Sequence, residues 1–385
     1  MNTSVSLISS YPFICFSRAP LGFKAGIPMY CKSIYQSSPI KPLILNCSLS
    51  SGLPTETRDT DGFTEITCRS EFVVGTIALS AAYIKFMFHF LKSARLIHIQ
   101  SPDPLTFLIL FVYCIFFGKT FKILTTWHAE IYKSYPLLSP FLCFLDLCIY
   151  ALSDLIIFFT ESHRNTSIFS HFRWFYSKSI ISPFIIFPQF RPSKSPLDRY
   201  QDYSLMSMPF RIVSIGRLVS YKGYSYAIQA INLCKSLPIH YTIIGNGPLL
   251  SKLRYLIKSL NLSGRVSILT DISESDKFEI LDKSSVFLFP STTRSEAYGI
   301  AQLEASFCSL PVINTDLGNG VNELLPSSDS ITVDPRSPQA IANAIKGLYF
   351  SRDNYLYFSM QSLRRFGSLS VPTSNFNLFT LDFFQ

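Results

Sequence analysis

Short apolar runs alternate with amphipathic segments throughout the second half of the chain, and this alternation narrows the possible folds more than any other feature. The apolar runs predict strands, and the segments between them have the periodicity of helices. The predicted strands are 211–216, 239–245, 265–269, 285–290, 311–315 and 330–334, and the predicted helices are 224–237, 248–260, 274–283, 298–308 and 337–350. Because such alternation builds βαβ units, this half is predicted to be α/β with a doubly wound parallel sheet.

The first half shows the same alternation less regularly. Its predicted strands are 41–47, 95–100, 122–128 and 154–160, its predicted helices are 72–92 and 105–117, and 50–64 is predicted to be a loop. Residues 189–208 contain two prolines and no periodic apolar pattern, which is typical of a linker. We therefore predict an α/β chain of two Rossmann-like domains whose parallel sheets face each other across a cleft. The predicted parts are domain 1–190, linker 191–208, domain 209–350, and a tail, 351–385, that packs back on the first domain.

The composition supports two packed domains. The 385 residues are 48% hydrophobic and 15% charged, which is typical of a chain with large cores and not of a disordered one. The apolar run 105–117 is shorter than the roughly 20 residues that span a membrane. The run 141–160 contains Asp146 and Asp154, so we interpret it as a buried helix followed by a strand. No membrane-spanning segment is predicted, and the first residues lack the pattern of a signal peptide.

The net charge of +9 belongs mainly to the first half, where 18 Lys and Arg stand against 11 Asp and Glu in residues 1–200. A basic, aromatic half suits an anionic membrane surface, although the charge can also serve solubility alone. The chain has no arginine-rich run, so no nucleic-acid partner is expected. Its nine cysteines are odd in number and form no CxxC pair, which argues against a disulfide framework and a zinc site and favours the cytoplasm.

The segment SEAYGIAQLEA, residues 295–305, carries the strongest functional pattern. Glu296 follows a predicted strand and Glu304 lies two turns into the helix that comes next. Ligands bind at this edge of an open α/β sheet, where the N–H groups of a helix start face a phosphate. Two carboxylates on either side of an anion suit the hydroxyls of a sugar and of a ribose. The alternative is an ordinary amphipathic helix with two solvated glutamates.

Two cations follow the first strand of the second half. Arg217 and Lys222 both come from its carboxyl end and suit a diphosphate, because charge-assisted hydrogen bonds to phosphate are strong. The alternative is a pair of solvated loop cations. The next strand ends in GNGP, where Gly245 and Gly247 allow a ligand to approach the backbone. Most such glycine pairs are simply turns, and no GK[ST] follows that would make this a P-loop.

His128 closes the predicted strand 122–128, a position typical of ligand-contacting residues. Glu130 follows two residues later. The alternative for His128 is a satisfied structural hydrogen bond, which we favour for His98. The triplet from Asp59 to Asp61 lies in a polar stretch and not after an apolar strand, so no metal site is predicted. No G-x-S-x-G motif supports a hydrolase triad.

The order of these motifs resembles that of retaining glycosyltransferases of family 4, which have the two-lobed GT-B fold. The resemblance rests on IGRLVSYKG, IIGNGPLLSKL, FLFPSTTRSEAYGIAQLEASFCSLPVINT and DPRSPQAIANAI in the second half, and on IHIQSPDPL and TWHAEIYKSYPLL in the first. It covers roughly residues 90–350. Within the family, the chain is most similar to bacterial mannosyl- or rhamnosyltransferases that build surface polysaccharides.

The resemblance implies a role for each candidate residue. Arg217 and Lys222 hold the donor diphosphate, Glu296 contacts the transferred sugar, Glu304 contacts the ribose, and His128 lies near the donor sugar. Glu296, His128, Arg217 and Lys222 form the implied catalytic set. The remaining implied donor contacts are Gly245, Gly247, Thr270, Ala297, Tyr298, Gly299 and Ile300, and the acceptor-side residues are Gly26 and Glu130. Enzymes of this family need no bound metal, and the leaving phosphate helps to deprotonate the acceptor, so Glu130 is a doubtful base.

The resemblance therefore predicts a retaining hexosyltransferase that needs no cofactor. Its expected donor is a nucleoside-diphosphate sugar, with GDP favoured over UDP and a mannose-like sugar favoured. Its expected acceptor is a lipid-linked oligosaccharide in O-antigen or capsule biosynthesis, at the inner face of the plasma membrane. The alternatives are a sugar-nucleotide epimerase or hydrolase on the same fold, and a non-catalytic nucleotide-sugar-binding descendant. The chain departs from the family near Gly26, where Ala25 replaces a glycine and Pro28 fits only the first turn of a helix.

Overall fold

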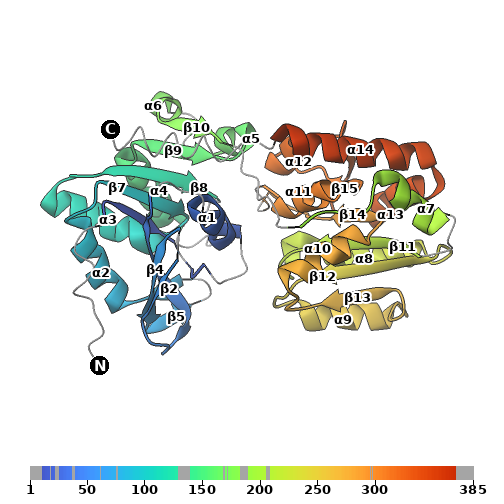
Figure 1. Ribbon diagram of the computed structural model, residues 1–385, viewed down its shortest axis with the longest axis horizontal. Coiled ribbons are helices and arrows are strands. Elements are labelled where there is room, and N and C mark those ends of the chain that lie inside the picture. The colour runs from blue at the N-terminus through green and yellow to red at the C-terminus, as the bar shows by residue number, and fades with distance from the viewer. Residues whose placement is uncertain are drawn as a thin grey trace. The chain divides into compact units, whose positions relative to one another are not determined.

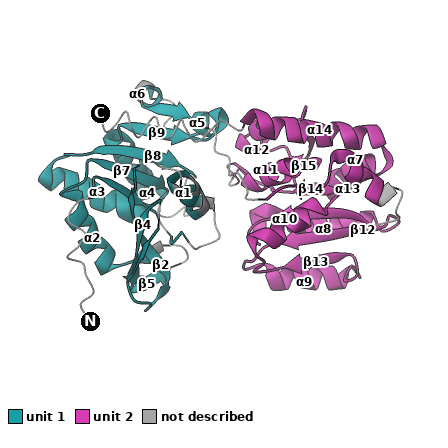
Figure 2. Cartoon of the chain, in the orientation of Figure 1, with its two compact units in different colours: residues 1–184, 371–385 teal, residues 185–370 magenta. Residues whose placement is uncertain are grey.

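The computed structural model describes residues 11–17, 19–21, 26–36, 40–60, 62–74, 77–128, 139–167, 170, 172–182, 190–204, 209–294, 296 and 298–369. The chain divides into two compact units, coloured separately in Figure 2. Unit 1 comprises residues 1–184 and 371–385, and unit 2 comprises residues 185–370. The predicted linker at 191–208 therefore falls within unit 2.

Unit 2 contains a six-stranded sheet in which every neighbouring pair is parallel. Its strands are β11 (Phe210–Ile215), β12 (Ile239–Ile244), β13 (Val266–Leu269), β14 (Val286–Phe289), β15 (Val312–Thr315) and β16 (Ile331–Val333). They lie in the order β13-β12-β11-β14-β15-β16, so the first strand of the unit is central and the order reverses between β11 and β14. Such a reversal is the point at which doubly wound sheets bind ligands.

Helices cover both faces of this sheet (Figure 1). They are α8 (Tyr224–Leu233), α9 (Leu250–Ser259), α10 (Glu274–Asp282), α11 (Ile300–Phe307), α12 (Gly320–Leu324), α13 (Pro338–Phe350) and α14 (Arg352–Leu369). Alternate residues of β11 point to opposite faces, as in any strand. Ile212 joins a buried cluster with α8, α9 and α13, whereas Val213 joins a second cluster with α10 and α11.

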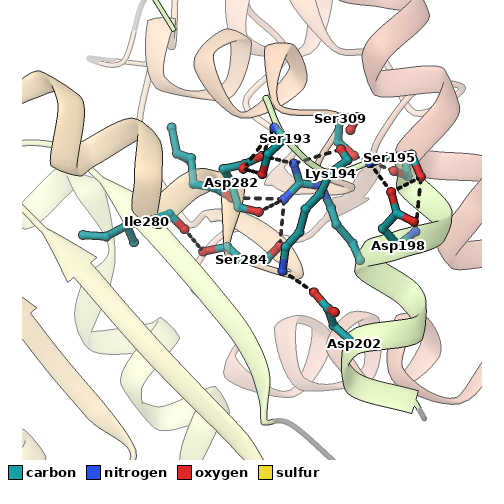
Figure 3. Close-up of polar contacts among 12 residues, drawn as sticks. Ser193, Lys194, Ser195, Asp198, Asp202, Ile280, Asp282, Ser284 and Ser309 are labelled. Atoms are coloured by element: carbon teal, nitrogen blue, oxygen red, sulfur yellow. Dashed lines mark hydrogen bonds and ion pairs between the residues drawn. The ribbon is translucent and has the colours of Figure 1, made fainter. Parts of the chain in front are cut away.

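The segment that joins the units is tied to unit 2 by buried polar contacts. Helix α7 (Pro196–Ser204) carries Arg199, whose side chain is 1% exposed and pairs with Asp282 at 2.7 Å. The same carboxylate accepts the Ser193 N–H at 3.1 Å, as Figure 3 shows. Residues 352–369 of the predicted tail belong to unit 2 and not to the first domain, because α14 packs against α7, α11 and α13. Residues 370–385 lie outside the described part of the chain.

Unit 1 contains an eight-stranded sheet in the order β10-β9-β8-β7-β1-β2-β4-β3, parallel except where β3 meets β4. Its strands are β1 (Phe13–Phe16), β2 (Leu43–Ser51), β3 (Glu56–Asp59), β4 (Thr64–Ser70), β7 (Leu96–Ser101), β8 (Lys122–Trp127), β9 (Leu155–Phe158) and β10 (Ser179–Ile181). Its helices are α1 (Gly26–Gln36), α2 (Ala81–Leu91), α3 (Pro104–Phe117), α4 (Ser139–Leu152), α5 (Glu161–Asn165) and α6 (Arg173–Ser177).

Two predictions for unit 1 are wrong. Residues 72–92 were expected to form a helix, but β5 (Phe72–Val74) and β6 (Ile77–Leu79) are a pair of antiparallel strands, and α2 begins only at Ala81. The stretch 50–64 was expected to be a loop, but it contains β3, all of whose residues are exposed. β3 has no apolar alternation to reveal it, because its four residues, ETRD, are all polar and exposed.

Among the described residues, no helix combines the length and the apolar character that a membrane span requires. The run 141–160 forms helix α4 followed by strand β9, as predicted.

Candidate functional site

The order reversal in unit 2 brings together the loops that follow β11 and β14, because these two strands are paired neighbours. Gly223 lies in the first loop with a left-handed φ of +69°, and a Cβ there would stand 1.9 Å from the carbonyl oxygen of Pro290. The Thr292 N–H donates to the carbonyl oxygen of Tyr221 at 2.7 Å. Only glycine permits the close approach of residue 223 to Pro290, so Gly223 allows the two loops to pack against each other.

Lys222 and Glu296 meet where the two loops touch, and we call this pair and its surroundings the switch-point site. The Lys222 ammonium forms an ion pair with Oε2 of Glu296, and the two side chains are 12% and 13% exposed. The ammonium also lies 5.0 Å from the centre of the Phe289 ring, within the range of a cation–π contact. The structure thus brings together two residues that the sequence placed 74 positions apart.

The loop that carries Glu296 is held from the far side as well. Asn319, the N-cap of α12, donates from Nδ2 to the Glu296 carbonyl oxygen at 2.5 Å. The Ser291 hydroxyl donates weakly to the carboxylate at 3.5 Å. Backbone and side chain of Glu296 are therefore both fixed before any ligand arrives, which lowers the entropy cost of binding.

Arg217 lies two residues after β11, and it is exposed. Burial raises the pKa of Tyr221 to about 12; the negative charge of Glu296 adds to that rise, and the positive charge of Arg217 opposes it. The Tyr221 phenol therefore stays protonated at neutral pH and can donate a hydrogen bond. The predicted cations and Glu296 thus share one electrostatic neighbourhood.

Gly245 and Gly247 have a structural reason to be glycine. A Cβ at Gly245 would lie 2.0 Å from the carbonyl oxygen of Gly216, and one at Gly247 would lie 2.7 Å from that of Leu218. The two loops that follow β11 and β12 therefore pack backbone against backbone. Thr270, directly after β13, is partly exposed at the same edge of the sheet. The structure supports the turn interpretation of GNGP and leaves its predicted contact with a ligand as a proposal.

Helix α11 begins beside the switch-point site. Its N-cap is Gly299, with a left-handed φ of 80° and no side-chain cap, and the helix starts at Ile300. Uncapped N–H groups at a helix start suit an anion. Tyr298 is buried next to them, whereas Ala297 lies outside the described residues.

Glu304 is not a solvated carboxylate. Its side chain is 7% exposed, and Oε1 lies 2.8 Å from the ammonium of Lys277 on α10. Burial raises the pKa of Glu304, and the positive charge of Lys277 opposes that rise. The alternative for this segment was an amphipathic helix with two solvated glutamates. Neither Glu296 nor Glu304 is solvated, because each forms an ion pair with a lysine and is largely shielded from water.

His128 lies in unit 1, directly after β8, at the end of a chain of polar contacts. Its Nε2 lies 2.8 Å from Oε1 of Gln100, whose Nε2 lies 3.1 Å from Nε2 of His98. Nδ1 of His98 in turn lies 2.5 Å from the Tyr35 hydroxyl. Burial lowers the pKa of His98 to about 3, and burial together with His98 and His163 lowers the pKa of His128. Both imidazoles are therefore neutral at pH 7, and the favoured structural role of His98 agrees with these contacts.

The acceptor-side candidates are only partly described. Gly26 is the first residue of α1, which places Pro28 in the first turn of that helix, where a proline is tolerated. Glu130 lies outside the described residues. Among the described residues, no group of three or more His, Cys, Asp or Glu side chains is arranged to hold a metal ion.

The sequence did not reveal the partners of the predicted residues. Gln100, Lys277 and Asn319 each contact a predicted residue directly. Lys277 lies three residues after Glu274, a spacing that indicates a helical ion pair, but nothing in the sequence pointed it toward Glu304.

Residues 201–361 match the family model described as "Glycosyl transferases group 1". Similar curated proteins include D-rhamnosyltransferase WbpZ of Pseudomonas aeruginosa, 29% identical over 35% of this chain and 35% of that protein. O-antigen chain mannosyltransferase C of Escherichia coli is 28% identical over 40% of each chain. The matched segments span less than half of the length of these relatives.

Solved structures resemble the chain over nearly its whole length. HepE of Anabaena in complex with UDP and glucose has a TM-score of 0.73 at 14% identity, covering 97% of this chain and 99% of that one. Sucrose-phosphate synthase of Thermosynechococcus elongatus also has a TM-score of 0.73, at 15% identity, covering 97% and 98%. This likeness confirms the predicted fold class, the two-unit α/β fold of GT-B type.

Proposed function

We propose that the chain is a retaining hexosyltransferase using a nucleoside-diphosphate sugar, on the premise that residues 201–361 match the model of the glycosyl transferases group 1 family. The observation that carries the proposal is the Lys222–Glu296 pair at the order reversal of the unit 2 sheet. An ammonium and an uncapped helix start suit a diphosphate, while a carboxylate that is already oriented suits sugar hydroxyls.

Each residue of the switch-point site then has one task. Lys222 and the exposed Arg217 bind the donor diphosphate and stabilise the negative charge that develops on it as it leaves. Glu296 exchanges part of its contact with Lys222 for hydrogen bonds to the transferred sugar. Residues 298–300 present backbone to the phosphates.

The donor and acceptor are proposed more finely than the family itself requires. We favour a GDP-linked, mannose-like hexose, supported by the rhamnosyl- and mannosyltransferase names of two relatives. A UDP-linked sugar is the alternative, because HepE was solved with UDP and glucose. The proposed acceptor is a lipid-linked oligosaccharide of surface polysaccharide biosynthesis, reached from the cytoplasmic face of the membrane.

An apolar face on unit 1 supports a membrane-bound acceptor. Helices α3 and α4 pack side by side, with Phe111 and Phe144 in ring contact at 6.0 Å between centroids. The α3/α4 face, as we call it, consists of the exposed residues Leu108, Ile115, Phe116, Phe141, Phe144 and Leu147. Exposed apolar patches of this kind mark protein or membrane contacts. With the positive charge of the first half, the chemistry fits the surface of an anionic bilayer.

A transfer assay tests the proposed activity. Purified protein is incubated with GDP-mannose or UDP-glucose and a membrane lipid extract, and both the released nucleoside diphosphate and the glycosylated lipid are measured. Glu296→Gln should lower the rate about 100-fold or more, because it removes a charged contact in the transition state. The matched control is Glu279→Gln, since Glu279 is an exposed carboxylate on α10 with an ion pair of its own.

The products distinguish the competing functions. Release of free hexose or of an epimerised nucleotide sugar without any glycosylated lipid would favour the hydrolase or epimerase. Normal turnover by Glu296→Gln would remove the role proposed for that residue. Nucleotide binding with no turnover on any extract would favour the non-catalytic descendant.

A further inference from the structure

A buried ion pair in unit 2 joins helices α10 and α11, the second of which begins beside the switch-point site. The Lys277 ammonium lies 2.8 Å from Oε1 of Glu304 and 2.7 Å from Oε2 of Glu274. The Lys277 and Glu304 side chains are 8% and 7% exposed, whereas Glu274 is 56% exposed. The Lys277–Glu304 pair is therefore buried, whereas Glu274 lies at the surface.

Stability is a poor explanation for a buried pair of this kind. Removing two charges from water costs several kcal/mol, and apolar residues of similar volume often replace such pairs without loss. An apolar alternative is at hand, because Phe278 and Leu281 of α10 already pack with Ala305 and Cys308 around α11. The pair thus occupies a position that the core could fill more cheaply.

The location of Glu304 points to a ligand. It lies four residues after the first residue of α11, which is about 6 Å along the helix axis from the uncapped start. Lys277 comes from α10, which follows β13 and packs on the same face of the sheet as α11. Both residues therefore stand beside the edge at which the diphosphate is proposed to bind.

The bonding of the carboxylate is one-sided. Its Oε1 accepts a hydrogen bond from Lys277, and none of the described residues donates a hydrogen bond to its Oε2. Burial raises the pKa of Glu304, so a neighbouring cation is needed to favour the ionised form. The pKa of Lys277 is lowered by burial, but the Glu304 and Glu274 carboxylates outweigh this and raise it overall, so Lys277 is charged at neutral pH.

We propose that Lys277 is a positioning residue for nucleotide recognition: it fixes the Glu304 carboxylate through Oε1 and leaves Oε2 to accept hydrogen bonds from the ribose hydroxyls. The inference rests on the proposed function, since it requires a ribonucleotide at the switch-point site. In this proposal Lys277 enables the site to distinguish ribose from deoxyribose. Contacts with the diphosphate or the base cannot make this distinction.

The test compares binding of GDP and UDP with binding of 2′-deoxy-GDP and 2′-deoxy-UDP by isothermal titration calorimetry. The wild type should prefer the ribonucleotide of its own base about tenfold or more, the value of one charge-assisted hydrogen bond. Lys277→Met should reduce that preference to near unity through weaker binding of the ribonucleotide, with the deoxynucleotide little affected. Glu304→Gln should show the same loss, and Lys277→Arg should retain most of the preference.

Two further variants separate positioning from folding. Lys283→Met removes an exposed lysine paired with Glu279 next to the same helix, and it should keep the wild-type preference. Melting temperatures are measured for all variants. If Lys277→Met does not fold, Lys277→Gln, whose amide still donates to Glu304 without charge, replaces it and should lose most of the preference.

The outcomes bear on two separate ideas. A preference in Lys277→Met or Lys277→Gln that stays within twofold of the wild-type value overturns the role of Lys277 while leaving the proposed function intact. If the wild type binds none of the four nucleotides, both the proposed function and this inference fail.

Discussion

At the scale of single residues, Gly223 determines whether the switch-point site exists. Its left-handed backbone and the 1.9 Å approach of a would-be Cβ to Pro290 exclude every other residue. We predict that Gly223→Ala lowers the free energy of unfolding by about 2 kcal/mol or more and abolishes nucleotide binding. Denaturant unfolding and calorimetry measure the two effects.

Gly264→Ala is the matched control for that substitution, because a Cβ at Gly264 meets nothing within 4 Å. It should change stability by less than about 0.5 kcal/mol. If Gly223→Ala behaved like Gly264→Ala, the two loops would not be held together in the way described.

His98 predicts how stability depends on pH. Its pKa in the folded protein is about 3, compared with 6.5 in an unfolded chain, because burial disfavours the charged form. The unfolded state therefore binds more protons between these values, so this contribution is complete above pH 6.5 and is lost as the pH falls toward 3. The slope is about 1.4 kcal/mol per pH unit within that window.

Urea unfolding at several pH values tests this prediction. His98→Asn should be less stable than the wild type at pH 7 but should lose less stability on acidification below pH 6. His89→Asn, at an exposed histidine of unit 1, should follow the wild-type curve. Parallel curves for the wild type and His98→Asn would show that His98 is not buried in its neutral form.

At the scale of elements, the α3/α4 face predicts where the protein meets a membrane. Phe116 and Ile115 are 75% and 61% exposed near the end of α3. Replacing both with serine should weaken cosedimentation with vesicles of phosphatidylglycerol and phosphatidylcholine at least fivefold, because the pair removes much of the apolar area that enters the bilayer. The melting temperature should hardly change, because neither side chain is buried.

Phe350→Ser is the control for the membrane prediction, since this residue is 71% exposed but lies on α13 of unit 2. It should leave vesicle binding unchanged. Equal loss in the two variants would show nonspecific adhesion of exposed aromatic side chains, and no loss in either would remove the membrane role of α3 and α4.

The elements also show what the sequence could predict. Every predicted strand of unit 2 lies within one or two residues of an observed one, because each is a short apolar run between helices of clear period. In unit 1, strands β5 and β6 lie where a helix was predicted to begin, and no proline or charged residue between β6 and α2 marks the change. All residues of β3 are exposed, so the sequence has no apolar pattern from which this strand could be predicted.

At the scale of the whole molecule, the sequence identified the candidate residues but not the side chains that hold them in place. Arg217, Lys222, Glu296 and Glu304 could be chosen because each follows a predicted strand end or helix start. Asn319 and Lys277 could not, because each reaches its partner across elements whose packing only the fold defines. The same applies to Gln100, which meets His128 through the pairing of β7 with β8.

The central claim is that the switch-point site binds the diphosphate of a nucleotide sugar, and calorimetric titration with GDP-mannose and UDP-glucose tests it most directly. The account predicts saturable binding of at least one of them, weakened tenfold or more by Lys222→Met, the size expected for a charge-assisted contact with phosphate. Lys252→Met, at an exposed lysine of α9, should bind as the wild type does. No binding by the wild type, or equal binding by wild type and Lys222→Met, would contradict the account.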